Sequence, residues 1–316
     1  MKSFIKQSLL AMALASGAAS AQPVSIVVPF PAGGGSDVYV RMLAAELSKD
    51  GLNTIVYNKP GASGNIAADY VAKSRPDGLT LFVGTNSTMA NNTVLFKNLP
   101  YDPVTDFTPV SHIGYQPSII VASTDLPYST LEEMVAYAKA NPKKINRGSP
   151  GAGIITNLAP MWFERMAGIE TTHVPFSGDA PGITALLSGT IDIHGTTITG
   201  PLSHIKSGKL RVLGVMDDKR LTQVPDAPTF KELGYDLVAY AWYTLVAPAG
   251  TPPENVAKLN VAINKVLARK DFVKKARAAG MEPRGGTSEE LGEYLRSEYA
   301  RWVPLLKDLE LTTSTY

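Results

Sequence analysis

The stretch PVSIVVPFPAGGGSDVYVRMLAAEL, residues 23–47, joins an apolar run, a glycine turn and a helical pattern in direct succession. Residues 24–28 are typical of a buried strand, and apolar residues recur with helical spacing over residues 37–49. Between them stand three consecutive glycines at positions 33–35. A glycine turn that leads from a strand into a helix presents backbone N–H groups and the positive end of the helix dipole to an anion. The stretch therefore predicts an α/β fold with an anion site at the end of its first strand.

Two nucleotide-binding motifs resemble this loop, but neither is complete. A dinucleotide fingerprint reads G-x-G-x-x-G, and Val38 stands where its third glycine belongs. A phosphate-binding P-loop requires Lys followed by Ser or Thr after its glycines, and Ser36-Asp37 stands there instead. The alternative to an anion site is a tight turn in which Ser36 or Asp37 only caps the helix.

The order of elements predicts a parallel sheet covered by helices. After the first strand and helix, residues 54–57 read as a strand, 64–73 as a helix and 79–83 as a third strand. This β-α-β-α-β order is typical of α/β folds. A second lobe starts near Asp125, where STLEE at 129–133 predicts a helix capped by Ser129 with Glu132 as its partner.

Further signals complete the two-lobe prediction. Three helix ends carry a glycine suited to the left-handed cap position, namely Gly168, Gly189 and Gly208. After Leu237 a long apolar stretch indicates a chain that returns to the first lobe, and Thr287 with Glu290 forms another capping box before the last helix. A chain that leaves and returns crosses twice, and two crossings form a hinge. We expect lobe one at 22–124 plus 238–316 and lobe two at 125–237.

Residues 1–21 have the layout of a secretory signal peptide. Lys2 and Lys6 give a basic start, residues 8–15 are mostly apolar, and Ala-Ser-Ala at 19–21 is a small-residue cleavage site. The apolar run is far shorter than the roughly 20 residues of a spanning helix. We expect export to the periplasm.

Composition excludes several functions. The chain has 30 Lys and Arg against 28 Asp and Glu, and two of the lysines lie in the predicted signal peptide, so the rest carries no formal net charge. No basic cluster predicts binding to nucleic acid or to a membrane surface. The absence of cysteine excludes disulfides and thiol chemistry. We therefore expect no nucleic acid, no membrane anchor and no cofactor.

The polar residues gather in loops that follow strands. Arg147 is the one Lys or Arg among them, so a ligand must find its counter-charge in N–H groups and helix dipoles. No G-x-S-x-G elbow occurs, and the four histidines lack metal-binding spacing, so we predict neither an enzyme nor a metal site. The loops are the glycine loop, GTNSTMANN at 84–92, RGSPGAGIITN at 147–157, HVPFSGDAPG at 173–182 and HGTTITG at 194–200.

Several motifs resemble the Bug family, the extracytoplasmic receptors of tripartite tricarboxylate transporters. The resemblance covers nearly the whole chain and implies a type II periplasmic-binding-protein fold, with two lobes of mainly parallel sheet and a small carboxylate ligand between them. The motifs are VPFPAGGGSDVYVRMLA, YNKPGASGNIAADYVAKSRPDGLTLFVGT, INRGSPGAGI, THVPFSG, LSHIKSGKLRVLGV and LVAPAGTPPENVAKLN.

The resemblance also implies the ligand-binding residues. Many relatives have an acidic or bulky stretch after the strand TIDIH, whereas this chain has Thr196 and Thr197, which we expect to bind a second carboxylate. A dicarboxylate or an aromatic carboxylate is therefore favoured. The residues carried over are Phe30, Ala32, Gly33, Gly34, Asp37, Thr85, Ser87, Ser149, Gly151, Gly153, Phe176, Ser177 and Asp179.

Three functions remain open from the sequence. The first is a monomeric receptor that delivers its carboxylate to a large and a small membrane subunit of the transporter. The second is a ligand sensor that presents its closed form to a sensor kinase. The third is an enzyme on the same fold, which rests on analogy of fold alone.

Overall fold

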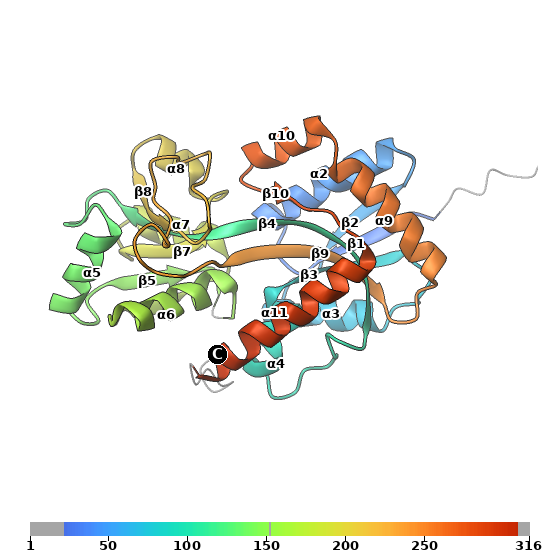
Figure 1. The fold of residues 1–316 in the computed structure, drawn as a ribbon, viewed down its shortest axis with the longest axis horizontal. Helices are drawn as coiled ribbons and strands as arrows, with labels where there is room; N and C mark the ends of the chain where they lie inside the picture. The colour runs from blue at the N-terminus through green and yellow to red at the C-terminus, as the bar shows by residue number, and fades with distance from the viewer. Residues whose placement is uncertain (1–21, 152, 309–316) are drawn as a thin grey trace, which may run out of the picture.

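The computed structural model describes residues 22–151 and 153–308, and the predicted signal peptide lies outside them. A sheet of 10 strands runs through two lobes in the order β2-β1-β3-β9-β4-β7-β5-β6, and β8 and β10 also pair with β4 (Figure 1). The strands are β1 (Val24–Val28), β2 (Thr54–Asn58), β3 (Thr80–Thr85), β4 (Phe107–Ser123), β5 (Asn146–Ser149), β6 (Thr172–Pro175), β7 (Ile193–Thr197), β8 (Leu210–Val215), β9 (Tyr240–Pro248) and β10 (Glu282–Pro283).

Helices lie against the sheet in both lobes. In the first lobe, α2 and α9 lie on one side of the strands and α3 and α11 on the other (Figure 1). No described helix is both long enough and apolar enough to cross a bilayer. The helices are α2 (Gly35–Lys49), η1 (Ala62–Gly64), α3 (Asn65–Ala72), η2 (Ser87–Asn91), α4 (Asn92–Leu95), α5 (Leu131–Ala140), α6 (Ile155–Ala167), α7 (Asp179–Leu187), α8 (Leu202–Lys206), α9 (Pro253–Leu267), α10 (Lys270–Ala278) and α11 (Ser288–Asp308).

The parallel pairing predicted from the alternating pattern is found inside each lobe. Strand β1 pairs in parallel with β2 and β3, and β5 pairs in parallel with β6 and β7. The strands that join the lobes, β4 and β9, are antiparallel to each other, and β9 is antiparallel to β3. Because β9 returns from the second lobe, it enters the first sheet from the opposite end and must run against its neighbour.

The two predicted crossings are the long strand β4 and the return into β9, which run side by side between the lobes (Figure 1). Residues 107–117 of β4 pair with β9, whereas residues 118–122 pair with β7. The change of lobe on the outward path therefore occurs within one strand. The division of the chain at residues 124 and 238 remains a proposal.

Most helix-end signals are confirmed. Gly168, Gly189 and Gly208 have φ of 63°, 73° and 74°, the left-handed region that glycine adopts at low cost. At the start of α11, Thr287 Oγ1 accepts from the Glu290 N–H at 3.1 Å. The Glu290 carboxylate accepts in return from the Thr287 N–H at 2.8 Å, which completes the capping box.

The predicted cap of α5 is wrong by one residue. Thr130, not Ser129, caps the helix, because its Oγ1 accepts from the Glu133 N–H at 3.2 Å. Glu133 in turn accepts from the Ser129 N–H at 2.6 Å. Adjacent hydroxyls followed by adjacent acids make both registers possible in the sequence. The observed register buries Leu131 and Met134 in the core.

A buried carboxylate fixes the last helix to the return strand. Glu298 of α11 accepts from Trp242 Nε1 of β9 at 2.7 Å and from Trp302 Nε1 at 3.2 Å. Both indole rings are buried. The C-terminal helix is therefore held to the strand that crosses between the lobes.

Candidate functional site

The strand-following loops of the two lobes meet at one place, called here the lobe junction and made of residues 30–37, 84–92, 147–157, 173–182 and 194–200. Ser87 Oγ and Asn91 Nδ2 in the first lobe each donate to the Gly153 carbonyl in the second at 3.4 Å. A Cβ at Gly35 would lie 3.6 Å from Thr199. The structure therefore brings the five predicted loops together, as expected at the carboxyl ends of strands.

The glycine loop presents backbone to the junction. Residues 31–34 are exposed, Gly33 has φ +84°, and Gly34 caps α2 without any side-chain hydrogen bond. Phe30, just before them, is half-buried. Because the first turn of a helix has N–H groups without intrahelical partners, this loop offers donors to an anion.

Asp37 shapes this loop. Its carboxylate is buried and accepts from the Gly33 N–H at 2.9 Å, from Arg41 Nε at 3.0 Å and from Asn58 Nδ2 at 2.8 Å. Burial alone would raise the pKa of Asp37, but the hydrogen bonds from Arg41, Gly33 and Asn58 outweigh it and hold the pKa below its usual value. The carboxylate thus folds the glycine turn, which is a role that the sequence did not assign to it.

The second loop contains a π-helical turn that the sequence did not predict. The turn η2 follows β3 directly, and Thr85 and Ser87 are both buried. The Thr85 N–H donates to Thr88 Oγ1 at 3.1 Å. Asn86 accepts from the Trp242 N–H at 3.1 Å, and its Nδ2 is buried without a partner. Short π-turns occur often at functional sites.

The third loop contains a serine, Ser149, that is hydrogen-bonded to a histidine of β6. Ser149 Oγ lies 2.8 Å from His173 Nε2 and 3.2 Å from the Gly151 carbonyl. Burial and the nearby charge of Arg147 lower the pKa of His173 to about 4, so the imidazole is neutral at neutral pH. Gly151 and Gly153 complete the turn into α6.

Arg147 is not available to a ligand. It is buried, donates to Glu164 Oε1 at 2.7 Å and to Asn157 Oδ1 at 2.7 Å. Arg147, the one Lys or Arg that the sequence placed at the edge of the loops, is therefore part of the second lobe's own packing. That backbone donors hold the ligand stays a prediction.

The fourth and fifth loops meet at Asp179. Thr196 Oγ1 donates to Asp179 Oδ1 at 2.6 Å, and His194 Nε2 lies 3.3 Å from the same oxygen. Thr196 and Thr197 are buried, so the hydroxyl proton expected to bind a second carboxylate is already used by Asp179. Phe176 is half-buried beside His194, and Ser177 is exposed.

One segment at the junction was missed. Gly61, Ala62, Ser63 and Gly64 all have positive φ, a strained backbone for the two non-glycine residues. The Ser63 carbonyl accepts from Asn92 Nδ2 at 3.2 Å, and a Cβ at Gly153 would lie 3.8 Å from Ser63 Oγ. The two glycines of this short turn were the sequence signal that could have identified it.

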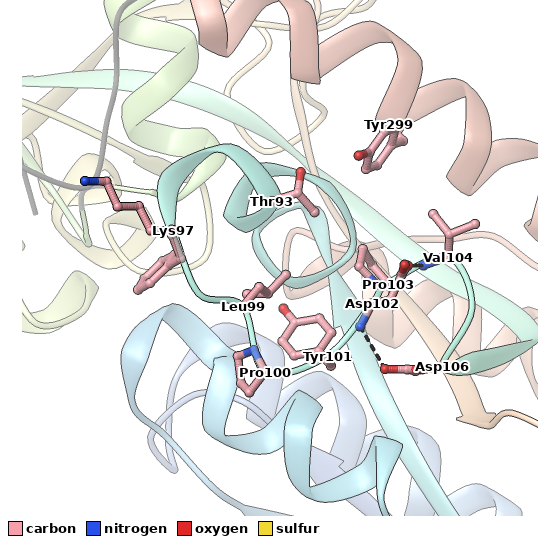
Figure 2. Close-up of a pocket in the computed structure, with 11 residues that line it drawn as sticks. Thr93, Lys97, Leu99, Pro100, Tyr101, Asp102, Pro103, Val104, Asp106 and Tyr299 are labelled. Carbon is pink, nitrogen blue, oxygen red and sulfur yellow. Dashed lines mark hydrogen bonds between the residues drawn. The ribbon is translucent and has the colours of Figure 1, made fainter.

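A separate open cavity of about 600 Å³ lies in the first lobe between α4, the segment that follows it and α11 (Figure 2). Asp106 in this segment accepts from the Asp102 N–H at 2.8 Å, so that carboxylate already has a partner in its own turn. None of the predicted site residues lines this cavity. Its lining is Thr93, Phe96, Lys97, Leu99, Pro100, Tyr101, Asp102, Pro103, Val104, Asp106 and Tyr299.

Within residues 22–151 and 153–308, no group of three metal-binding side chains occurs.

The family model described as "Tripartite tricarboxylate transporter family receptor" matches residues 39–311. The chain belongs to this receptor family. It is 32% identical to the BugT protein of Bordetella pertussis over 308 residues, covering 96% of this chain and 94% of the relative. The resemblance stated from the sequence motifs is thereby confirmed.

Solved structures extend this family assignment. Rpa4515 of R. palustris with adipate is 34% identical, with a TM-score of 0.87 over 92% of this chain and 97% of that one. MatC from Rhodopseudomonas palustris with bound malate is 32% identical, with a TM-score of 0.82 over 91% and 99%. The periplasmic binding protein BugD is 31% identical, with a TM-score of 0.83 over 92% and 98%. The predicted fold class is confirmed, and these relatives are solute-binding receptors.

Proposed function

We propose that this receptor captures a small carboxylate at the lobe junction, in the periplasm, and delivers it to a large and a small membrane subunit of a tripartite tricarboxylate transporter. A dicarboxylate or an aromatic carboxylate is the favoured ligand, and we expect the receptor to act as a monomer. The observation that carries the proposal is the meeting of five strand-following loops from two lobes, with exposed glycine backbone on one side.

The energetics support an anion held without a basic side chain. A hydrogen bond to a charged group contributes about 1.5–3 kcal/mol, and a helix N-terminus about 0.3–1 kcal/mol. A micromolar dissociation constant corresponds to about −8 kcal/mol, so a few N–H groups of the glycine loop and the dipole of α2 suffice. A carboxylate fits these donors, whereas a triphosphate requires a metal or several basic groups.

The relatives support the ligand class. Adipate and malate, found with two receptors that share this fold at more than 30% identity, are both dicarboxylates. Both are small enough to lie between two loops. We propose that the contacts come from the predicted residues of the glycine loop, from Thr85 and from the second-lobe loops, and that Ser87 acts through its hydrogen bond to the Gly153 carbonyl.

A ligand panel tests the proposal. Protein that begins at Gln22 is titrated by calorimetry, and its melting temperature measured, with succinate, malate, adipate, benzoate and acetate. Ligand at about 100 times its dissociation constant raises the free energy of unfolding by about 2.7 kcal/mol. The diamide of succinic acid is the matched control, because it keeps the shape and loses both charges. Binding of the diamide as tight as that of succinate, or no response to any carboxylate, would contradict the proposal.

A further inference from the structure

Among the described residues of the second-lobe loops at the junction, Asp179 is the one acidic side chain. It is the first residue of α7, and its side chain is 36% exposed. A Cβ at Gly200 would lie 3.8 Å from both its Cβ and its Oδ2. Gly200 follows Thr199, the residue that lies against Gly35 of the glycine loop. Only the segment formed by Thr199 and Gly200 therefore lies between Asp179 and the glycine loop of the first lobe.

The carboxylate of Asp179 is held from one side only. Thr196 donates to Oδ1, and His194 Nε2 lies near the same atom. Because a carboxylate oxygen accepts hydrogen bonds, His194 donates to Oδ1 in the tautomer that carries the proton on Nε2. Oδ1 is thereby supplied with donors from buried residues, while Oδ2 is directed toward Gly200 at the accessible side.

The Asp179 carboxylate neither caps its helix nor forms an ion pair with a Lys or Arg side chain. The cap residue of α7 is Gly178, and no side-chain hydrogen bond caps the helix. In the described part of the chain, no Lys or Arg forms an ion pair with Asp179. Burial raises the pKa of Tyr243 in the return strand β9, and the charge of Asp179 adds to this effect. Asp179 is thus an acceptor without a Lys or Arg partner, at a junction where the glycine loop presents exposed backbone.

We propose that Asp179 is a specificity-determining residue that accepts a hydrogen bond from a hydroxyl or ammonium group on the bound carboxylate. This inference rests on the proposed function and narrows it. A ligand with only carboxylates brings like charge toward Asp179, whereas a donor substituent provides the hydrogen that Oδ2 lacks. The receptor therefore selects hydroxy- or amino-substituted carboxylates over unsubstituted ones.

The test uses ligands that differ in one group. Succinate, malate and aspartate share a four-carbon skeleton and carry hydrogen, hydroxyl or ammonium at one carbon. Calorimetry of the wild type is expected to give malate or aspartate at least about tenfold tighter binding than succinate, which is the effect of one hydrogen bond to a charged group. Preference for malate identifies a hydroxyl as the partner, and preference for aspartate identifies an ammonium.

The variant Asp179→Asn removes the charge and keeps the shape. It is expected to bind succinate more tightly than the wild type and to reduce the preference for the substituted ligand by about tenfold. Asp236→Asn is the matched control, because Asp236 lies in the same predicted lobe with a side chain that is 92% exposed. Asp179→Ser provides a second variant if the first does not fold, as judged by its thermal transition.

The outcomes separate the two proposals. Equal binding of succinate, malate and aspartate to the wild type, or a preference that Asp179→Asn and Asp179→Ser leave unchanged, overturns the role of Asp179 and leaves the carboxylate receptor intact. Failure of every carboxylate to bind the wild type overturns the proposed function itself.

Discussion

On the first-lobe side of the junction, a Cβ added at Gly33 would meet nothing within 4 Å, and one at Gly34 would meet only the Pro31 carbonyl at 3.6 Å. On the second-lobe side, a Cβ at Gly195 would lie 2.2 Å from the backbone carbonyl of Thr156. The same residue type thus leaves backbone accessible in one lobe and permits close packing in the other. In the proposed function, the first side supplies N–H groups to the carboxylate, and the second supplies the side chains that distinguish one carboxylate from another.

The largest expected effect is on folding. Gly195→Ala places a methyl group against backbone that cannot move aside, so it should lower the free energy of unfolding by at least about 1–3 kcal/mol. The added methyl group of Gly34→Ala meets no such contact, so this variant should change the free energy of unfolding by less than about 0.5 kcal/mol. Urea denaturation of both variants measures the difference. Equal stability of the two variants would show that the glycines of the two lobes do not differ in role.

The next effect is on binding. Gly34 has φ of −73°, which proline adopts, so Gly34→Pro removes one N–H at a backbone angle that proline allows. We expect carboxylate affinity to fall at least about tenfold in Gly34→Pro, since a hydrogen bond to a charged group is lost. Gly34→Ala keeps the N–H and should bind like the wild type. Calorimetry checks both, and equal affinity of the two variants would exclude this N–H as a ligand contact.

A pH effect follows from Asp37. Because its folded-state pKa lies below its unfolded value of 3.8, its contribution to stability is complete above that value and is lost as pH falls through the folded-state pKa. Asp37→Asn should be less stable at neutral pH and should lose less stability on acidification. Thermal melts between about pH 7 and pH 2 measure this. Asp236→Asn, an exposed control, should retain the pH profile of the wild type.

The smallest expected effect concerns contact between the lobes. Ser87 and Asn91 donate to the same Gly153 carbonyl, so Ser87→Ala leaves one of two donors in place. Carboxylate affinity should fall by less than about fivefold, within the net value of one neutral hydrogen bond. A loss well beyond tenfold in calorimetry would instead place Ser87 in direct contact with the ligand.

Much of the fold followed from local patterns. Apolar runs, the glycines at helix ends and the box formed by Thr287 and Glu290 predicted elements that the structure contains, because these signals act within a few residues. The register of the α5 cap could not be predicted, because Ser129 and Thr130 are both good caps and tertiary burial of Leu131 decides between them.

The site was less predictable because its contacts are non-local. The residues next to Arg147 in the sequence do not show that its guanidinium donates to Glu164 and Asn157. Nor does the sequence show that the Asp37 carboxylate accepts from Arg41 and from the glycine loop instead of facing outward. The π-turn of η2 depends on packing against α11 and β9. Sequence patterns located the loops, while distant partners decide which of their groups remain available.

The most direct test of the account is a crystal structure of the receptor with malate bound. The account predicts one malate carboxylate within about 3.2 Å of N–H groups of the glycine loop, with the hydroxyl directed to Asp179. Malate bound in the cavity between α4 and α11, or held at the junction by a basic side chain, would contradict it.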